Sequence, residues 1–155
     1  MGRHFALLLT SLALCGANNA FADDALKSFI PKDNLGQFIV NNFDIRTIRS
    51  SIEPDRIAPG KPTFASLGMH PKSITNDSIH FEFNGWVYDI QILNRGDMNK
   101  DGIEDIAICF VDDGSGAGGT YYTKTPLLLT RYSNDTPLVA IAYKPVVTSC
   151  QSYTR

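Results

Sequence analysis

The segment 79–92 reads IHFEFNGWVYDIQI and decides the fold class. Apolar side chains occupy every second position on both sides of Asn84-Gly85, which is the period of a strand with one buried face. Asn84-Gly85 is a pair preferred in two-residue hairpin turns, because both turn positions need a positive φ. The segment therefore predicts an antiparallel β-hairpin.

Further strands are expected after this hairpin. Ile106–Val111 is apolar on both faces, which indicates a central strand. Tyr121–Tyr132 and Leu138–Tyr143 predict two more, and we expect Pro126 to interrupt the first because proline cannot donate to a ladder.

The part of the chain before the hairpin differs in character. Apolar residues between 35 and 42 recur at helical spacing behind Asp33 and Asn34, either of which could cap a short helix. The proline-rich segment 53–73 is typical of an extended connection. The expected fold class is α+β or mainly β: an antiparallel meander of about five or six strands with an N-terminal helical segment.

The first residues have the organisation of an export signal. Phe5–Cys15 is apolar but shorter than the roughly 20 residues that span a bilayer. Ala20-Phe21-Ala22 then supplies the small-x-small pattern of a cleavage site. We expect residues 1–22 to be a signal peptide and residues 23–155 to form one periplasmic or secreted domain. A lipoprotein anchored at Cys15 is the alternative, although Leu14 is larger than that processing site normally accepts.

Charge and cysteine content narrow the possible functions. The formal net charge of −2 lacks the basic footprint of a nucleic-acid binder. No later segment is long and apolar enough to span a membrane. In an exported protein, Cys109 and Cys150 most simply form a disulfide, and two buried thiols are the alternative.

The segment 97–105 reads DMNKDGIED and predicts a cation site. Ca²⁺ takes six to eight oxygen ligands, and short acidic loops with this spacing can wrap one ion. Gly102 permits the sharp turn. The expected ligands are the side chains of Asp97, Asn99, Asp101 and Asp105 and the backbone carbonyl of Ile103. The alternative is a solvated acidic turn that holds no metal.

This motif resembles the calcium loops of FG-GAP propeller repeats, and less closely those of dockerins and EF-hands. The resemblance covers Gly96–Phe110 and implies a bound calcium ion. It occurs once in the chain, which excludes a propeller. Ile108 stands where an EF-hand has its final carboxylate, so EF-hand helices are not expected.

The segment 112–122 reads DDGSGAGGTYY and is the second candidate for function. No lysine follows the glycines as in a phosphate-binding loop, and Ser115 lacks the flanking glycines of a nucleophile elbow. The segment is either a flexible hairpin loop or a binding loop. Small exported bacterial lysozyme inhibitors look similar, with a Ser-Gly loop and a nearby tyrosine that enters the enzyme. From that resemblance we expect Ser115, Gly116, Tyr121 and Tyr122 at an interface.

The leading functional hypothesis is a non-catalytic binding module, an inhibitor or immunity-type protein against a cell-wall-degrading enzyme. Its rival is a small envelope-polymer hydrolase, for which Glu82 and Asp89 could face each other as a carboxylate pair. His80, Asp112 and Asp113 are the other candidate acids and bases. A structural envelope protein is the third possibility.

Overall fold

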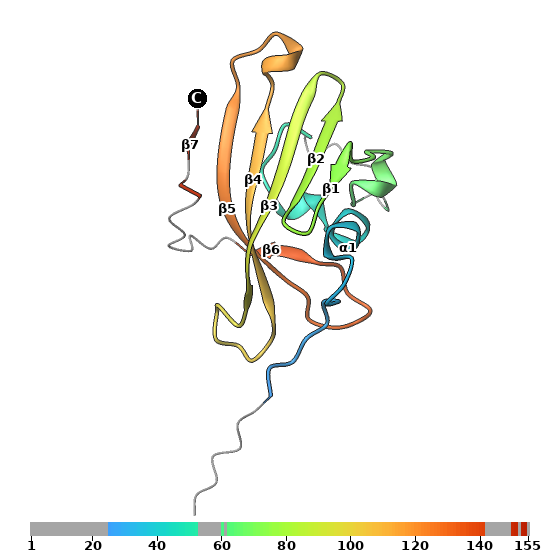
Figure 1. Cartoon of the computed structure of the whole chain (residues 1–155), viewed down its shortest axis with the longest axis vertical. Coiled ribbons are helices and arrows are strands. Elements are labelled where there is room, and N and C mark those ends of the chain that lie inside the picture. The colour runs from blue at the N-terminus through green and yellow to red at the C-terminus, as the bar shows by residue number, and fades with distance from the viewer. Residues whose placement is uncertain (1–24, 53–59, 61, 142–149, 152, 155) are drawn as a thin grey trace, which may run out of the picture.

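The computed structural model describes residues 25–52, 60, 62–141, 150–151 and 153–154, so the expected signal peptide lies outside the described residues. One antiparallel sheet dominates it, with six strands in the order in which the chain visits them (Figure 1). A seventh strand also pairs with the fifth. The strands are β1 (Ser73–Ile74), β2 (Ser78–Phe83), β3 (Trp86–Gly96), β4 (Asp105–Asp113), β5 (Tyr122–Thr130), β6 (Val139–Ile141) and β7 (Tyr153–Thr154). The expected meander is confirmed.

The hairpin at the start of the meander forms as expected. Phe83 pairs with Trp86, so β2 and β3 are joined by a two-residue turn. Asn84 and Gly85 have φ angles of 52° and 81°, the left-handed values that such a turn requires. The alternating apolar residues place Ile79, Phe81, Tyr88 and Ile90 in the core.

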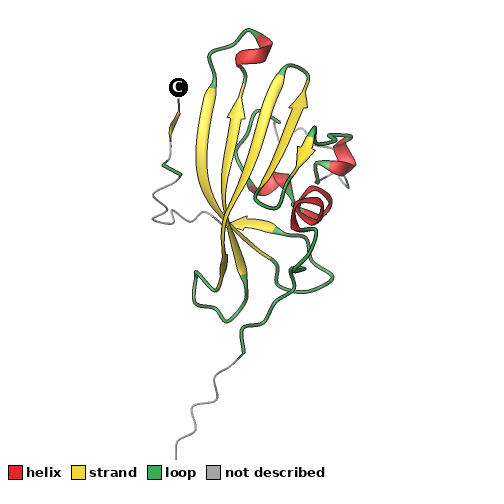
Figure 2. Ribbon diagram, in the orientation of Figure 1, coloured by secondary structure: helices red, strands yellow, loops and turns green. Residues whose placement is uncertain are grey.

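The one α-helix of the described residues, α1 (Leu35–Asn42), lies near β1 and β2 (Figure 2). Asn34 is its N-cap, as expected, but has a φ of 54° and makes no capping hydrogen bond through its side chain. Leu35, Ile39 and Val40 face the core that the sheet provides. Gly36 permits a close approach, because a Cβ there would lie 2.5 Å from Ile74 Cγ2.

β4 is the centre of the sheet. Eight of its nine residues are buried, because it lies between β3 and β5 and both of its faces are covered. The expectation about its neighbour was wrong, since β5 continues through Pro126, which pairs with Cys109. Within the described residues, β6 pairs only with 128–130 and β7 only with 123–124 of β5.

A disulfide joins Cys109 of β4 to Cys150, as expected, with the two Cα atoms 5.7 Å apart. It connects the C-terminal part of the chain to the central strand.

Among the helices of the described residues, none combines the length and apolar character needed to cross a membrane.

Candidate functional site

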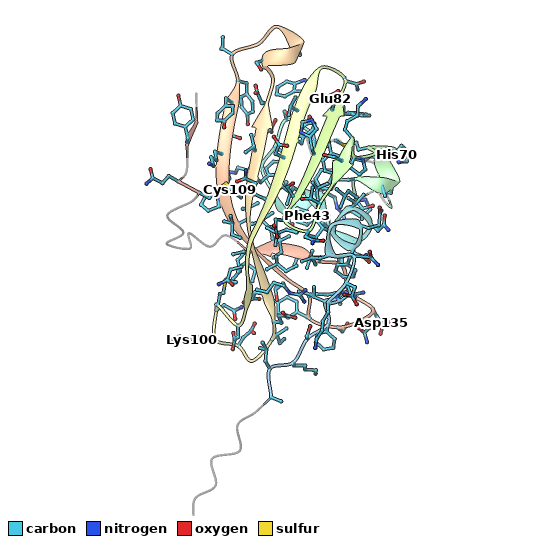
Figure 3. The ribbon with its side chains drawn as sticks, viewed as in Figure 1. Phe43, His70, Glu82, Lys100, Cys109 and Asp135 are labelled. Atoms are coloured by element: carbon cyan, nitrogen blue, oxygen red, sulfur yellow. A yellow bond between two sulfur atoms is a disulfide. The ribbon has the colours of Figure 1, made fainter. Side chains whose placement is uncertain are left out.

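The acidic loop connects β3 to β4 at the lower end of the sheet, where Figure 3 labels Lys100. Asp97 opens the loop and accepts hydrogen bonds from the N–H groups of Asp101 (3.0 Å) and Gly102 (2.9 Å). Gly102 has a φ of 82°, which lets the chain fold back over this carboxylate. The loop is therefore curled around the side chain of its first residue.

The next two candidate ligands are held in the same way. Asn99 Oδ1 accepts from the N–H of Asp101 (3.0 Å), and Asp101 Oδ1 accepts from the N–H of Ile103 (2.8 Å). Asn99 Nδ2 also donates to Asp101 Oδ2 (2.9 Å). Local backbone donors thus fix the side chains that the sequence singled out, and carboxylate oxygens can accept more than one partner.

Asp105 differs from the other candidate ligands because it is fully buried. Its Oδ2 accepts from the N–H groups of Met98 (3.0 Å) and Asn99 (3.3 Å), which directs the carboxylate into the loop. Its Oδ1 is buried without a hydrogen-bond partner. Thr130 lies opposite Asp105 in the β4–β5 register, and its Oγ1 is likewise buried without a hydrogen-bond partner. Burial raises the pKa of Asp105.

The expected ligands are three carboxylates, one side-chain amide and one backbone carbonyl. All of them offer oxygen atoms, which are the ligands that a hard cation such as Ca²⁺ prefers. In the ranges that the structure describes, however, no three His, Cys, Asp or Glu side chains converge as a metal-binding group. This includes the three carboxylates of the loop, Asp97, Asp101 and Asp105. The calcium site stays a prediction, and the unpartnered oxygen of Asp105 is the observation most in its favour.

The second candidate site is the loop between β4 and β5, at the opposite end of the sheet (Figure 1). It contains a short 3₁₀ turn, η4 (Ser115–Ala117), and its residues 115–121 are all exposed. The N–H of Gly114 donates to the carbonyl of Tyr121 (2.9 Å), and the carbonyl of Gly114 accepts from Ala117 and Gly119 (3.1 Å each). The loop is closed by its own backbone hydrogen bonds.

This loop also packs against the β2–β3 turn. A Cβ on Gly116 would lie 2.6 Å from the carbonyl oxygen of Gly85, and one on Gly114 would lie 2.7 Å from the ring of Trp86. The ring of Tyr121 meets Trp86 edge-on at 5.6 Å between centroids. We call residues 84–86 and 114–121 together the hairpin tip. Sequence reasoning missed the part played by 84–86, because a contact between two turns has no local pattern.

The four residues expected at an interface do not all lie together. Ser115, Gly116 and Tyr121 are exposed on the hairpin tip, and Tyr121 is 37% exposed. Tyr122 instead begins β5 and its ring contacts Tyr153 of β7 at 5.8 Å. Of the two tyrosines, only Tyr121 shares a surface with Ser115.

The candidate acids and bases are divided between the two faces of the sheet. Asp112 is buried on the core face, where its carboxylate accepts from the N–H and Oγ of Ser51 (2.6 Å each). Ser51 Oγ also lies 3.0 Å from the Tyr88 hydroxyl oxygen, and burial raises the pKa of both Asp112 and Tyr88. Asp112 is thus occupied in holding a neighbouring segment.

The strand alternation places His80, Glu82 and Asp113 on the other face. His80 Nδ1 lies 2.7 Å from Asp89 Oδ1, a hydrogen bond that raises the pKa of His80. The expected Glu82–Asp89 pair does not exist, because Glu82 lies opposite Val87 and Asp89 lies opposite His80.

A groove of about 740 Å³ lies between the start of α1, the β1–β2 turn and the end of β3. Its lining includes Asn34, Gln37, Asn76, Asn94 and Arg95. It contains none of the candidate acids and bases discussed above. The groove and the hairpin tip are therefore separate surfaces.

Comparison with protein-family models, curated proteins and solved structures finds no match to this chain.

Proposed function

We propose that this chain is an exported, non-catalytic binding module that inserts its hairpin tip into the cleft of a cell-wall-degrading enzyme. The observation that carries the proposal is the packing of the Gly116 backbone against Gly85 at the exposed end of the sheet. A protruding loop fixed by a second turn loses little conformational entropy when it binds, and this favours affinity.

The composition of the tip suits such a role. Its exposed glycines have no side chain that would keep a partner away from the backbone. Tyr121 adds an amphipathic ring whose position is set by Trp86. Tyrosine and tryptophan are the side chains most often found at the energetic centre of protein interfaces. A convex tip of this kind fits a concave active site better than a flat surface.

The position of Asp112 removes it from the candidate acids and bases. A general acid and a general base must both reach one substrate. Asp112 lies on the core face with Ser51, whereas His80, Glu82 and Asp113 share the other face, so any hydrolytic site would have to use that face alone.

Calcium is the second part of the proposal. We assign Asp97, Asn99, Asp101, Asp105 and the carbonyl of Ile103 as its ligands. Support comes from the curled loop and from Asp105, which has one buried oxygen without a partner. An ion there would hold the ends of β3 and β4 together. Millimolar calcium outside the cytoplasm would suffice for a structural site of modest affinity.

The partner surface can be tested with the purified protein and a panel of muramidases, amidases and peptidases that act on the cell wall. Binding and inhibition of cell-wall lysis are measured for the wild type, Tyr121→Ala and the matched control Tyr132→Ala. Tyr132 is also exposed, at 50%, but lies beyond β5 and away from the tip. We expect Tyr121→Ala to weaken binding by about 2 kcal/mol, a hot-spot value, and Tyr132→Ala to leave it unchanged.

Equal loss in the two variants would mean that the tip is not the contact surface. Turnover of a cell-wall polymer by the protein itself, abolished by Asp113→Asn or His80→Gln, would favour the hydrolase instead.

A further inference from the structure

The acidic loop is not isolated, because the N-terminal segment Lys27–Pro31 lies against it. Lys27 forms a parallel bridge with Ile103. The N–H of Lys27 donates to the carbonyl of Gly102 (3.0 Å), and its own carbonyl accepts from the N–H of Glu104 (2.8 Å). The backbone on both sides of Ile103 is therefore held by a residue far away in the sequence.

Side chains reinforce this contact. The carboxylate of Glu104 accepts from Arg95 Nε (3.0 Å), Arg95 Nη2 (3.0 Å) and Ser28 Oγ (2.5 Å). Although burial opposes the shift, these donors lower the pKa of Glu104. Arg95 Nη1 also donates to the carbonyl of Pro31 (2.9 Å). Glu104 thus contacts the N-terminal segment directly through Ser28 and indirectly through Arg95.

The two neighbours of Glu104 are ligands of the proposed ion. Ile103 offers the backbone carbonyl, and Asp105 offers the buried oxygen that has no partner in the protein. Fixing Glu104 from outside therefore sets the direction in which both neighbours point. An ion bound to the Ile103 carbonyl would in turn fix the backbone on both sides of Ile103. The Gly102 carbonyl and the Glu104 N–H would then stay in place for their hydrogen bonds with Lys27.

We propose that the calcium site is bipartite, with the loop 97–105 supplying the ligands and the segment Lys27–Pro31 acting as a clamp that positions them. The inference rests on the calcium site of the proposed function. Calcium binding and docking of the N-terminal segment are then cooperative, and each favours the other by the same factor. Couplings of this kind are typically about five- to 150-fold. Docking would be completed where calcium is abundant, outside the cytoplasm.

The first test is proteolysis of the wild-type protein by an enzyme that cleaves after lysine, with cleavage sites and rates read by mass spectrometry. Calcium at about 1 mM, in the range that fills extracellular sites, is compared with excess chelator. We expect calcium to slow cleavage after Lys27 about tenfold or more relative to cleavage after Lys72. Lys72 is exposed and lies beside β2, so it reports general stabilisation.

The second test is calorimetric titration of calcium into Lys27→Pro, which lacks the N–H that donates to Gly102. Leu26→Pro is the matched control, because within the described part of the chain the Leu26 N–H donates no hydrogen bond. We expect Lys27→Pro to raise the calcium Kd about tenfold and Leu26→Pro to leave it near the wild-type value.

The outcomes separate the two proposals. If the wild type binds no calcium, the calcium site itself is wrong. A second outcome is that the wild type binds calcium, calcium protects the bonds after Lys27 and Lys72 equally, and Lys27→Pro binds calcium as tightly as the wild type. In that case the calcium site is supported and the clamp is refuted. The proteolysis experiment needs no variant, so a folding defect in Lys27→Pro would not leave the inference untested.

Discussion

At the scale of single residues, Asp112 shows how a buried carboxylate can be structural. Its raised pKa means that the folded state holds its proton to a higher pH than the unfolded state. The contribution of this group to stability is therefore full below about pH 4, the unfolded value, and is lost as the pH rises through the raised folded value. Above that window its contribution no longer changes with pH.

We predict that Asp112→Asn flattens this part of the stability profile, because an amide keeps the shape of the site but does not titrate. The Asn oxygen can accept from the Ser51 N–H and its amide can donate to Ser51 Oγ. Asp112→Ala should instead cost about 1–3 kcal/mol at neutral pH, since it leaves the half-buried Ser51 N–H without an acceptor. Urea unfolding of the three proteins between about pH 4 and pH 7 gives both quantities. Parallel profiles for the wild type and Asp112→Asn would contradict the assignment.

At the scale of elements, local patterns were sufficient where the partners are close in sequence. The alternation around Asn84-Gly85 predicted β2, β3 and their turn, and the apolar run Ile106–Val111 predicted β4. A two-residue turn also fixes the register, so the facing Glu82–Asp89 pair could have been excluded from the sequence.

Contacts between distant segments could not be predicted in the same way. Ser51 meets Asp112 across 61 positions, and the two turns of the hairpin tip meet through backbone atoms. Neither contact leaves a periodic signal. Pro126 was misjudged because the rule against proline in strands concerns its missing N–H, and a local sequence pattern does not show whether a neighbouring strand needs that donor.

The hairpin tip gives a prediction at this scale. Gly116→Ala should destabilise the protein by about 1–3 kcal/mol, the usual cost of overpacking, because the Gly85 carbonyl oxygen, 2.6 Å from the new Cβ, belongs to the backbone of a tight turn. Ser115→Ala, on the exposed side of the same 3₁₀ turn, should change stability by less than about 0.5 kcal/mol. Chemical denaturation measures both. Equal stability of the two variants would mean that the two turns separate easily and that the tip is not rigid.

At the scale of the whole molecule, the disulfide connects the C-terminal part of the chain to the central strand. The two cysteines are 41 positions apart, and closing a loop of that length corresponds to about 4 kcal/mol in the chain-entropy model. We predict that the double variant Cys109→Ala, Cys150→Ala unfolds at a lower urea concentration, with a loss of about 2–4 kcal/mol. Reduction of the wild type should reproduce the loss and have no effect on the variant. A wild type whose midpoint does not respond to reductant would contradict a structural role for the bond.

The acidic loop lies at the other end of β4 from the hairpin tip, so the proposed ion should act on the sheet as a whole and not on the loop alone. At a calcium concentration about ten times the Kd, binding to the folded state alone adds about 1.4 kcal/mol to the free energy of unfolding. For a domain of this size that corresponds to a rise in Tm of roughly 3–6 °C. Asp97→Asn removes a charged ligand and one of the two oxygens that accept from the Asp101 and Gly102 N–H groups, so it should lower the Tm in chelator and also lose most of the rise that calcium gives. Asp135→Asn, in an exposed turn elsewhere, should keep all of it. The Tm of the three proteins is measured by scanning calorimetry in calcium, in magnesium and in chelator. A wild-type Tm that is the same under all three conditions would mean that the loop binds neither ion.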